Sequence, residues 1–299
     1  MNIESPVKIL VQRRAAIGDV IMSTGVVREL RKRYGPEAQI DVATEFLEPY
    51  RNNPHVSNLI PMSALPTDIA RHWDIYINLD NAYETNPINH YVDTYFHRAF
   101  GDWLGLDQNV ELYPDSDDRD IVDQDLAQIG DKFIVVHMRN WHWGAKNIQP
   151  DVWFQVFEKL FLARSDFKIV CAGGPTDLMI ADHPLFYDVR TRYNSQQLKL
   201  LCDSAACFVG IDSGPFQCAA ASNTHIIALL THLHPDRILP YRSGIQGHEC
   251  TVIQTSEDCG GCNDHQARPV SQLVCHKQTY PCTGNFDVDA IANAILEQL

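Results

Sequence analysis

A strand, a tight polar turn and the start of a helix follow one another at residues 207–221, and this junction has residue types that hold anionic ligands. The apolar strand leads into Asp212, Ser213 and Gly214. Pro215 then stands in the first turn of the predicted helix, where its missing N–H costs nothing. Such a junction directs backbone N–H groups and the positive end of the helix dipole toward a ligand above the strand. The sequence therefore predicts a diphosphate-binding site here.

Four cysteines near the end of the chain form a second candidate site. Cys259 and Cys262 have the C-x2-C spacing of a metal-binding turn, and Cys275 and Cys282 follow. Four thiolates are compatible with tetrahedral zinc in a structural site. Reduced thiols and disulfides stay open as alternatives, although a cytoplasmic location disfavours disulfides.

The elements that must position these residues alternate between strand and helix. Apolar runs predict strands at 7–12, 40–43, 75–79, 133–137, 168–172, 207–210 and 226–230. Helices are predicted from about residue 17 to the stop at Gly35, around 91–103, across 153–161, and from a cap at Asp287 to the end of the chain. Alternating strands and helices indicate parallel sheets.

A polar, acidic run at residues 114–120 separates the two halves of the chain. This composition favours an interdomain linker. We therefore predict one domain at 1–120 and a second at 121–299. Two successive open α/β sheets place a ligand cleft between the carboxyl ends of their strands.

The charge balance limits the partners of this chain. Its 38 acidic and 24 basic residues give a net charge of -14, which disfavours nonspecific attraction to nucleic acid or anionic membranes. Basic side chains after the first strand and on the first predicted helix are candidates for a local basic patch, and a solvated face is the alternative; they are Arg13, Arg14, Arg28, Arg31, Lys32 and Arg33. No apolar run approaches the roughly 20 residues of a membrane span, and the N-terminus lacks the apolar core of a signal peptide. These features predict a cytoplasmic protein.

Common nucleotide-binding motifs are missing from the sequence. It contains no G-x-x-x-x-G-K-[ST], and no G-x-G-x-x-G follows the first strand. A P-loop hydrolase and an ordinary dinucleotide-dependent dehydrogenase are therefore weak hypotheses. Phosphate groups must be bound in another way.

An ordered set of motifs resembles glycosyltransferase family 9, the heptosyltransferase family. Each motif lies at the end of a predicted strand: KILVQR at 8–13, IGDV at 17–20, GGP at 173–175, and DSGP at 212–215 with AAA at 219–221. The resemblance implies a GT-B fold, in which two Rossmann-like domains with parallel sheets face a central cleft. It assigns the acceptor to the first domain and the nucleotide sugar to the second.

The resemblance also implies inverting sugar transfer. That reaction needs a base for the acceptor hydroxyl and a group that stabilises the departing diphosphate. Asp19 matches the base of the family, and helix capping is the alternative role for its carboxylate. No metal or other cofactor is required for catalysis if protein groups stabilise the diphosphate.

Donor-binding residues are implied in the second domain. Lys146 lies in a polar and aromatic loop that resembles the phosphate-binding loop of the family, and Arg139 is a candidate to assist it. Asp212, Ser213 and Gly214 resemble the segment that contacts sugar and phosphate. The chain departs from the family at Gln217, because histidine is usual there and glutamine cannot titrate.

The GGP loop supplies two further donor-side candidates. Gly174 belongs to this loop, and Asp177 lies just after it, beyond Thr176. Asp177 is predicted either to reach the nucleotide ribose or to cap a helix.

A polar cluster after the strand at 75–79 is the predicted acceptor side. A similar arrangement of asparagine, aspartate, tyrosine and glutamate occurs in some family members, and simple loop solvation is the alternative. The candidate residues are Asn78, Asp80, Tyr83, Glu84 and His90.

The leading hypothesis is an inverting glycosyltransferase that moves a sugar from a nucleotide-sugar donor, such as ADP-heptose, to a saccharide or lipid-linked acceptor. A first alternative is a glycosyltransferase acting on modified DNA bases, which the net charge disfavours. A second is a catalytically silent protein that only binds nucleotide sugars, an alternative motivated by Gln217. Transfer to any acceptor separates the first two hypotheses from the third.

Overall fold

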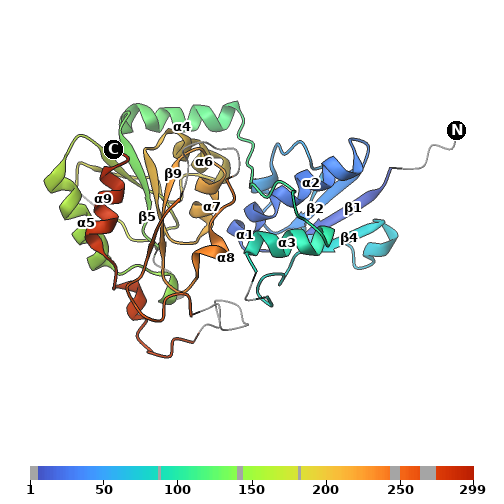
Figure 1. The fold of residues 1–299 in the computed structure, drawn as a ribbon. Coiled ribbons are helices and arrows are strands. Elements are labelled where there is room, and N and C mark those ends of the chain that lie inside the picture. Colours follow the sequence, from blue (N-terminus) through green and yellow to red (C-terminus); the bar gives the residue numbers. More distant parts are fainter. Residues whose placement is uncertain (1–5, 87–88, 140–143, 181–182, 243–249, 263–273) are drawn as a thin grey trace.

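Two parallel sheets lie side by side in the computed structural model, which describes residues 6–86, 89–139, 144–180, 183–242, 250–262 and 274–299 (Figure 1). In this part of the chain the first sheet has four strands in the order β3-β2-β1-β4. Its strands and flanking helices are β1 (Lys8–Gln12), α1 (Ile17–Met22), α2 (Thr24–Tyr34), β2 (Gln39–Thr44), β3 (Asn58–Pro61), β4 (Ile75–Asn78) and α3 (Tyr91–Phe100).

The second sheet, over the same described residues, has six strands in the order β10-β9-β8-β5-β6-β7. Its central strands β5 and β8 are buried along their whole length, as expected for a parallel sheet covered by helices on both faces. The elements are α4 (Ser116–Ile129), β5 (Phe133–His137), α5 (Pro150–Ala163), β6 (Lys168–Cys171), β7 (Phe186–Asp188), α6 (Ser195–Ser204), β8 (Cys207–Gly210), α7 (Gly214–Ala220), β9 (His225–Leu230), α8 (Pro235–Ile238), β10 (Cys250–Gln254) and α9 (Val288–Leu296).

The sequence-based fold prediction is confirmed, with two local corrections. The helix predicted to run to Gly35 is divided at Ser23, whose hydroxyl donates to the Val20 carbonyl oxygen at 2.7 Å and so competes with the helical backbone. Residues 116–120 of the predicted linker are helical, because α4 begins at Ser116 and passes through the predicted boundary at 120/121, which stays a prediction.

Helix α4 starts in the acidic run for a clear physical reason. The Asp115 side chain accepts the backbone N–H of Asp118, and the Asp118 side chain accepts the N–H of Asp115. This reciprocal capping, together with acidic residues in the first turn, favours a helix start. The helix packs against α6 and lies over the second sheet (Figure 1). Helix α9 packs against α5, so the end of the chain also covers the second sheet.

Contacts at several places join the two halves of the described chain, and two of them matter most for the site. Helix α1 packs against α7, and a Cβ built at Gly214 would lie 2.7 Å from the Ile17 Cγ2 atom. Only a glycine at this position permits so close an approach. Farther along the interface, the Glu48 carboxylate accepts the backbone N–H groups of Ser195 at 3.1 Å and Gln196 at 3.3 Å, at the start of α6.

Candidate functional site

A cavity of about 710 Å³ lies between the carboxyl ends of the two sets of strands. In the first sheet the strand order reverses between β1 and β4, and in the second it reverses between β5 and β8. Ligands of open α/β sheets bind at such reversal points. The size of the cavity is in the range of a small-molecule site.

Most of the predicted site residues line this cavity. They are Asp19, Tyr83, Glu84, Arg139, Lys146, Gly174, Asp177, Asp212, Ser213, Gly214 and Gln217. The residues that do not appear in the lining are Asn78, Asp80, His90 and the cysteines Cys259, Cys262, Cys275 and Cys282. The structure therefore brings the predicted base and the predicted donor residues together, but it places part of the predicted acceptor cluster elsewhere.

The three acceptor candidates outside the lining make local contacts. The Asn78 side-chain oxygen accepts the backbone N–H of Asp80, and the Asp80 carboxylate accepts the backbone N–H of Arg14 at 2.7 Å. The His90 ring caps α3 by accepting the N–H of Val92, and its other nitrogen lies 2.8 Å from the Leu239 carbonyl oxygen. These contacts hold the loop after β4 in place.

Asp19 is fixed by donors on both carboxylate oxygens. Its Oδ1 atom accepts the hydroxyls of Tyr83 at 2.5 Å and Tyr95 at 3.3 Å, and it lies 3.0 Å from the Arg13 guanidinium. Its Oδ2 atom accepts the backbone N–H of Ala16 at 2.9 Å. Asp19 thus caps α1 and lines the cavity at once, so the two roles proposed for it from sequence are compatible.

Lys146 is paired with Asp212 on the opposite side of the cavity. The two charged groups are 2.6 Å apart and largely buried. Burial alone would raise the pKa of Asp212, but the Lys146 ammonium, with the Arg139 guanidinium nearby, holds that pKa below its ordinary value. Asp212 is therefore ionised, and it balances part of the Lys146 charge.

Neighbouring groups complete this charged cluster. The Arg139 guanidinium donates to the Asp212 backbone carbonyl oxygen at 3.4 Å. His232 is buried, and its burial together with the Lys146 charge lowers its pKa to about 3, so its ring is neutral at neutral pH. Residues 140–143 of the predicted phosphate-binding loop lie outside the described part of the chain.

The turn after β8 offers fewer backbone donors than its sequence suggests. Pro215 has no N–H, and the Phe216 N–H donates to the Ser213 hydroxyl at 3.3 Å. The Gln217 N–H donates to the Ser213 carbonyl oxygen at 3.2 Å. Ligand contacts in this turn are consequently expected mainly from side chains and from the Gly214 N–H.

Gln217 is almost completely buried beside α1. Its side chain has a relative exposure of 2%, and its amide nitrogen has no hydrogen-bond partner among the described residues. A Cβ at Gly18 would lie 3.4 Å from the Gln217 Cγ atom. The residue that departs from the family pattern thus lies where the two sheets meet.

Three lining residues were not among the site residues predicted from the sequence. Arg13 lies beneath the Tyr83 and Tyr95 rings, His137 ends β5, and the Arg237 guanidinium lies 5.0 Å from the Tyr91 ring centroid. A sequence signal for each residue existed: Arg13 and His137 are polar residues at the end of a buried strand, and Arg237 lies near a proline. Their roles depend on partners far away in the sequence, which no local pattern reveals.

The cysteine segment lies apart from the cavity. None of the nine cysteines of the chain, all of which lie in the described part, is in a disulfide. Burial raises the pKa of Cys282 to about 12, and the nearby thiols of Cys259, Cys262 and Cys275 contribute to this increase. The three thiols are thus close enough to Cys282 to influence it, but among the described residues the four cysteines do not form a group whose ligand atoms all lie within 4.8 Å of one another.

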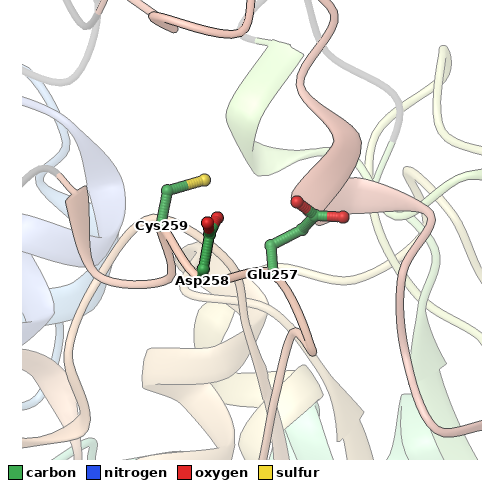
Figure 2. A group of neighbouring side chains, drawn as sticks. All are labelled: Glu257, Asp258 and Cys259. Atoms are coloured by element: carbon green, nitrogen blue, oxygen red, sulfur yellow. The ribbon is translucent and has the colours of Figure 1, made fainter.

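A second group of potential metal ligands includes Cys259 and two carboxylates, whose negative charge is offset by a lysine. Glu257, Asp258 and Cys259 point toward a common region (Figure 2), with ligand atoms within 4.8 Å of one another. The Lys277 ammonium lies 2.8 Å from the Glu257 carboxylate and 2.6 Å from that of Asp258. A cation is thus already supplied by the chain, and this group does not need a metal ion.

Comparisons with known proteins establish the fold. No protein-family model matches the chain, and no curated protein matches it. Among solved structures, it is similar to a glycosyl transferase of family 9 from Veillonella parvula, at 17% identity and a TM-score of 0.70 over 98% of this chain and 97% of the other. It is also similar to ADP-heptose LPS heptosyltransferase II of E. coli, at 18% identity and a TM-score of 0.65 over 98% and 99%.

A third similar structure was solved in complex with a nucleotide sugar. It is the dodecameric iron-containing heptosyltransferase TibC of enterotoxigenic E. coli in complex with ADP-D-beta-D-heptose, at 12% identity and a TM-score of 0.67 over 100% of this chain and 79% of the other. The chain therefore has the GT-B fold of the family 9 structures, as the sequence resemblance predicts. No helix in the described residues is long and apolar enough to span a membrane.

Proposed function

We propose that this chain is an inverting glycosyltransferase that moves a sugar from a nucleotide-sugar donor to a saccharide or lipid-linked acceptor. One observation carries the proposal. A single cavity is lined by Asp19 from the first sheet and by Lys146, Asp212 and Ser213 from the second. A carboxylate thus faces a cationic cluster across a space large enough for a small-molecule ligand.

The proposed reaction uses the two sides of the cavity for different tasks. The acceptor hydroxyl oxygen forms a bond to the anomeric carbon of the donor, on the face opposite to the diphosphate. Asp19 takes the hydroxyl proton, and the sugar–diphosphate bond breaks with its electron pair going to the diphosphate. Lys146 and Arg139 offset the negative charge that develops there.

The donor class is supported by the solved structures. TibC was solved with ADP-D-beta-D-heptose, and E. coli WaaC was solved with ADP. We therefore propose a nucleotide sugar of the ADP-heptose type as the donor. In this scheme protein groups stabilise the leaving diphosphate, so the transfer step itself uses no metal ion.

A DNA acceptor is less well supported. Two of the basic side chains on α2 are already engaged within the chain: Arg28 pairs with Glu111 at 2.7 Å, and Arg31 donates to the carbonyl oxygens of His55 and Ala38. These residues do not offer free cations to a phosphate backbone. The silent alternative is also weaker than the buried Gln217 suggests, because Asp19 lines the cavity as the proposed base.

We also propose that Cys259, Cys262, Cys275 and Cys282 hold one structural metal ion. The C-x2-C spacing of Cys259 and Cys262 supports this proposal, burial and the thiols of Cys259, Cys262 and Cys275 raise the pKa of Cys282, and none of the four is in a disulfide. Four thiolates suit zinc or iron, and TibC is described as iron-containing. The bound ion would supply a rigid crosslink in the segment after β10. It would take no part in sugar transfer, because these cysteines do not line the cavity.

The experiment that tests the function is a transfer assay with ADP-heptose and other nucleotide sugars against saccharide, lipid-linked and modified-DNA acceptors. We expect transfer to a saccharide or lipid-linked acceptor, with the anomeric configuration inverted in the NMR spectrum of the product. Donor binding without transfer to any acceptor would favour the silent alternative. Transfer to DNA alone would favour a glycosyltransferase that acts on modified DNA bases.

A further inference from the structure

Three buried side chains form a hydrogen-bonded chain at the point where β5 and β8 meet. The Ser213 hydroxyl lies 2.9 Å from His137 Nδ1, and His137 Nε2 lies 3.1 Å from the Asp177 carboxylate. Their relative exposures are 6%, 3% and 7%, and all three line the cavity. From the sequence, Ser213 and Asp177 were predicted to contact a ligand, but His137 was not.

Asp177 decides which nitrogen of His137 carries the hydrogen. The Asp177 Oδ2 atom accepts the backbone N–H of Gly174 at 2.7 Å, and the same oxygen faces His137 Nε2. An ionised carboxylate only accepts hydrogen bonds, so Nε2 must donate. Burial lowers the pKa of His137, which keeps the ring neutral. Nδ1 is therefore an unprotonated acceptor.

This arrangement also fixes the Ser213 hydroxyl. Its hydrogen must point to His137 Nδ1, because that nitrogen has no hydrogen of its own. One lone pair of the hydroxyl oxygen accepts the Phe216 N–H at 3.3 Å. A hydroxyl has two acceptor positions, so one remains. The nucleophilic Ser-His-Asp triad has the opposite arrangement: there Nε2 faces the serine, and Nδ1 donates its hydrogen to the aspartate.

The backbone at Gly173 leaves room for the contact between Asp177 and His137. Gly173 has a φ of +140°, which L side chains rarely adopt. A Cβ at this position would lie 2.3 Å from the Asp177 Oδ2 atom and 2.9 Å from the His137 Cδ2 atom. Glycine thus lets the carboxylate pack directly against the imidazole.

We infer that Asp177 and His137 are positioning residues that hold Ser213 as a hydrogen-bond acceptor, so that the ligand group above Ser213 is a hydroxyl and not a phosphate oxygen. An ionised diphosphate has no hydrogen to donate. If Ser213 turned its own hydrogen to the phosphate, Nδ1 would be left as a buried acceptor without a donor. The inference rests on the proposed function for the identity of the ligand, and its hydroxyl comes from the transferred sugar or from the nucleotide ribose.

The ring state of His137 can be tested without any ligand. Two-dimensional NMR of ¹⁵N-labelled protein distinguishes the two neutral forms of histidine, and loss of the signal in His137→Gln assigns it. We expect the hydrogen on Nε2 and none on Nδ1 at neutral pH. A hydrogen on Nδ1 would overturn the inference whatever the protein binds, and this result would leave the proposed function untouched.

Calorimetric titration tests the ligand group. The probes are ADP-heptose, ADP, the 2′- and 3′-deoxy analogues of ADP, and inorganic pyrophosphate. We expect Ser213→Ala to weaken binding of the probe that carries the hydroxyl about 5- to 10-fold, the effect of one lost hydrogen bond. Weaker binding of ADP-heptose alone assigns the transferred sugar. Weaker binding of ADP as well, but not of one deoxy analogue, assigns the ribose.

Two outcomes of the titration would overturn the inference. One is a loss of pyrophosphate affinity in Ser213→Ala, which would show that Ser213 donates to phosphate. The other is unchanged affinity for every probe. A wild-type chain that binds no nucleotide probe would overturn the proposed function and the ligand assignment together, while the NMR result would still report on His137.

The positioning role has its own readout. His137→Phe removes the acceptor for the Ser213 hydrogen, so we expect weaker binding of the hydroxyl-bearing probe with pyrophosphate affinity kept or increased. His137→Gln retains an acceptor and should restore most of the affinity. A purely structural role would lower all affinities together and contradict the inference. His225→Phe, on β9 of the same sheet and outside the cavity lining, is the control.

Discussion

The two sides of the cavity hold their charged groups in different ways. We call Arg13, Asp19, Tyr83 and Tyr95 the acceptor wall, and Lys146, Asp212, His137, Asp177 and Ser213 the donor wall. On the acceptor wall several donors converge on the single carboxylate of Asp19. On the donor wall the groups are instead linked in a pair, Lys146–Asp212, and in a chain, Ser213–His137–Asp177.

This difference indicates how each wall responds to a substitution. Removing Asp19 leaves donors that can bond to one another or to water, so the effect falls on the reaction. Removing Lys146 leaves a buried carboxylate beside the expected position of a diphosphate, so the effect falls on donor binding and on stability. Substitutions on each wall can test this contrast.

The largest effect is expected for Asp19→Asn. We expect sugar transfer to fall about 10²- to 10⁴-fold, because the amide cannot take the acceptor proton, while donor affinity stays near that of the wild type. Steady-state kinetics and calorimetric titration with the donor measure the two quantities. The control is Asp41→Asn, which changes a still more deeply buried carboxylate of the first sheet outside the cavity lining. Near-normal turnover in Asp19→Asn would show that Asp19 is a helix cap and not the base.

A smaller effect, now on binding, is expected for Lys146→Ala. Donor and nucleoside diphosphate affinity should fall about 10- to 100-fold, because a charge-assisted contact is lost. The unpaired Asp212 should cost about 3 kcal/mol of unfolding free energy. Adding Asp212→Asn should restore stability but not affinity, as thermal unfolding and calorimetry can show. Lys159→Ala, at an exposed pair with Asp289, is the matched control. Unchanged nucleotide affinity would remove Lys146 from the donor site.

The contact between the walls is tested by Glu48→Ala. Loss of the acceptor for the Ser195 and Gln196 N–H groups should cost about 1 kcal/mol or somewhat more in unfolding free energy. Nucleoside diphosphate affinity should not change, because the donor wall belongs to the second sheet alone. Glu45→Ala, at an exposed carboxylate nearby, is the control. A large loss of nucleotide affinity would show that the donor wall depends on the first sheet.

The smallest effect on the cavity is expected from metal removal. Chelation should lower the melting temperature while donor affinity stays constant, because the four thiols lie outside the lining. Elemental analysis of protein purified under reducing, chelator-free conditions should find about one metal ion per chain. A metal-free protein with an unchanged melting temperature would end the metal hypothesis.

The buried strands were predictable from the sequence because continuous apolar runs specify them. The strand predicted at 207–210 matches β8, and that at 133–137 matches β5. Three short strands, β3, β7 and β10, were not predicted. Most of their residues are only partly buried, and they do not form a continuous apolar run. Helix α4 was missed because its acidic start was interpreted as a linker.

The donor wall could be predicted further than the acceptor wall. Asp212, Ser213 and Gly214 follow a buried strand in one short motif, so a local pattern locates them. The contacts of Asp19 depend instead on side chains 64 and 76 residues away, namely Tyr83 and Tyr95. Such partners become neighbours only when β1 and β4 pair, and a single sequence does not show this pairing.

The close packing of α1 on α7 makes two distant positions of the sequence depend on each other. A side chain larger than hydrogen at position 214 would collide with the γ-methyl group of Ile17. A related chain with alanine at 214 should therefore carry a smaller residue at 17, and a chain that keeps isoleucine at 17 should keep glycine at 214. Among relatives of this protein, these positions should covary even though nearly 200 residues separate them.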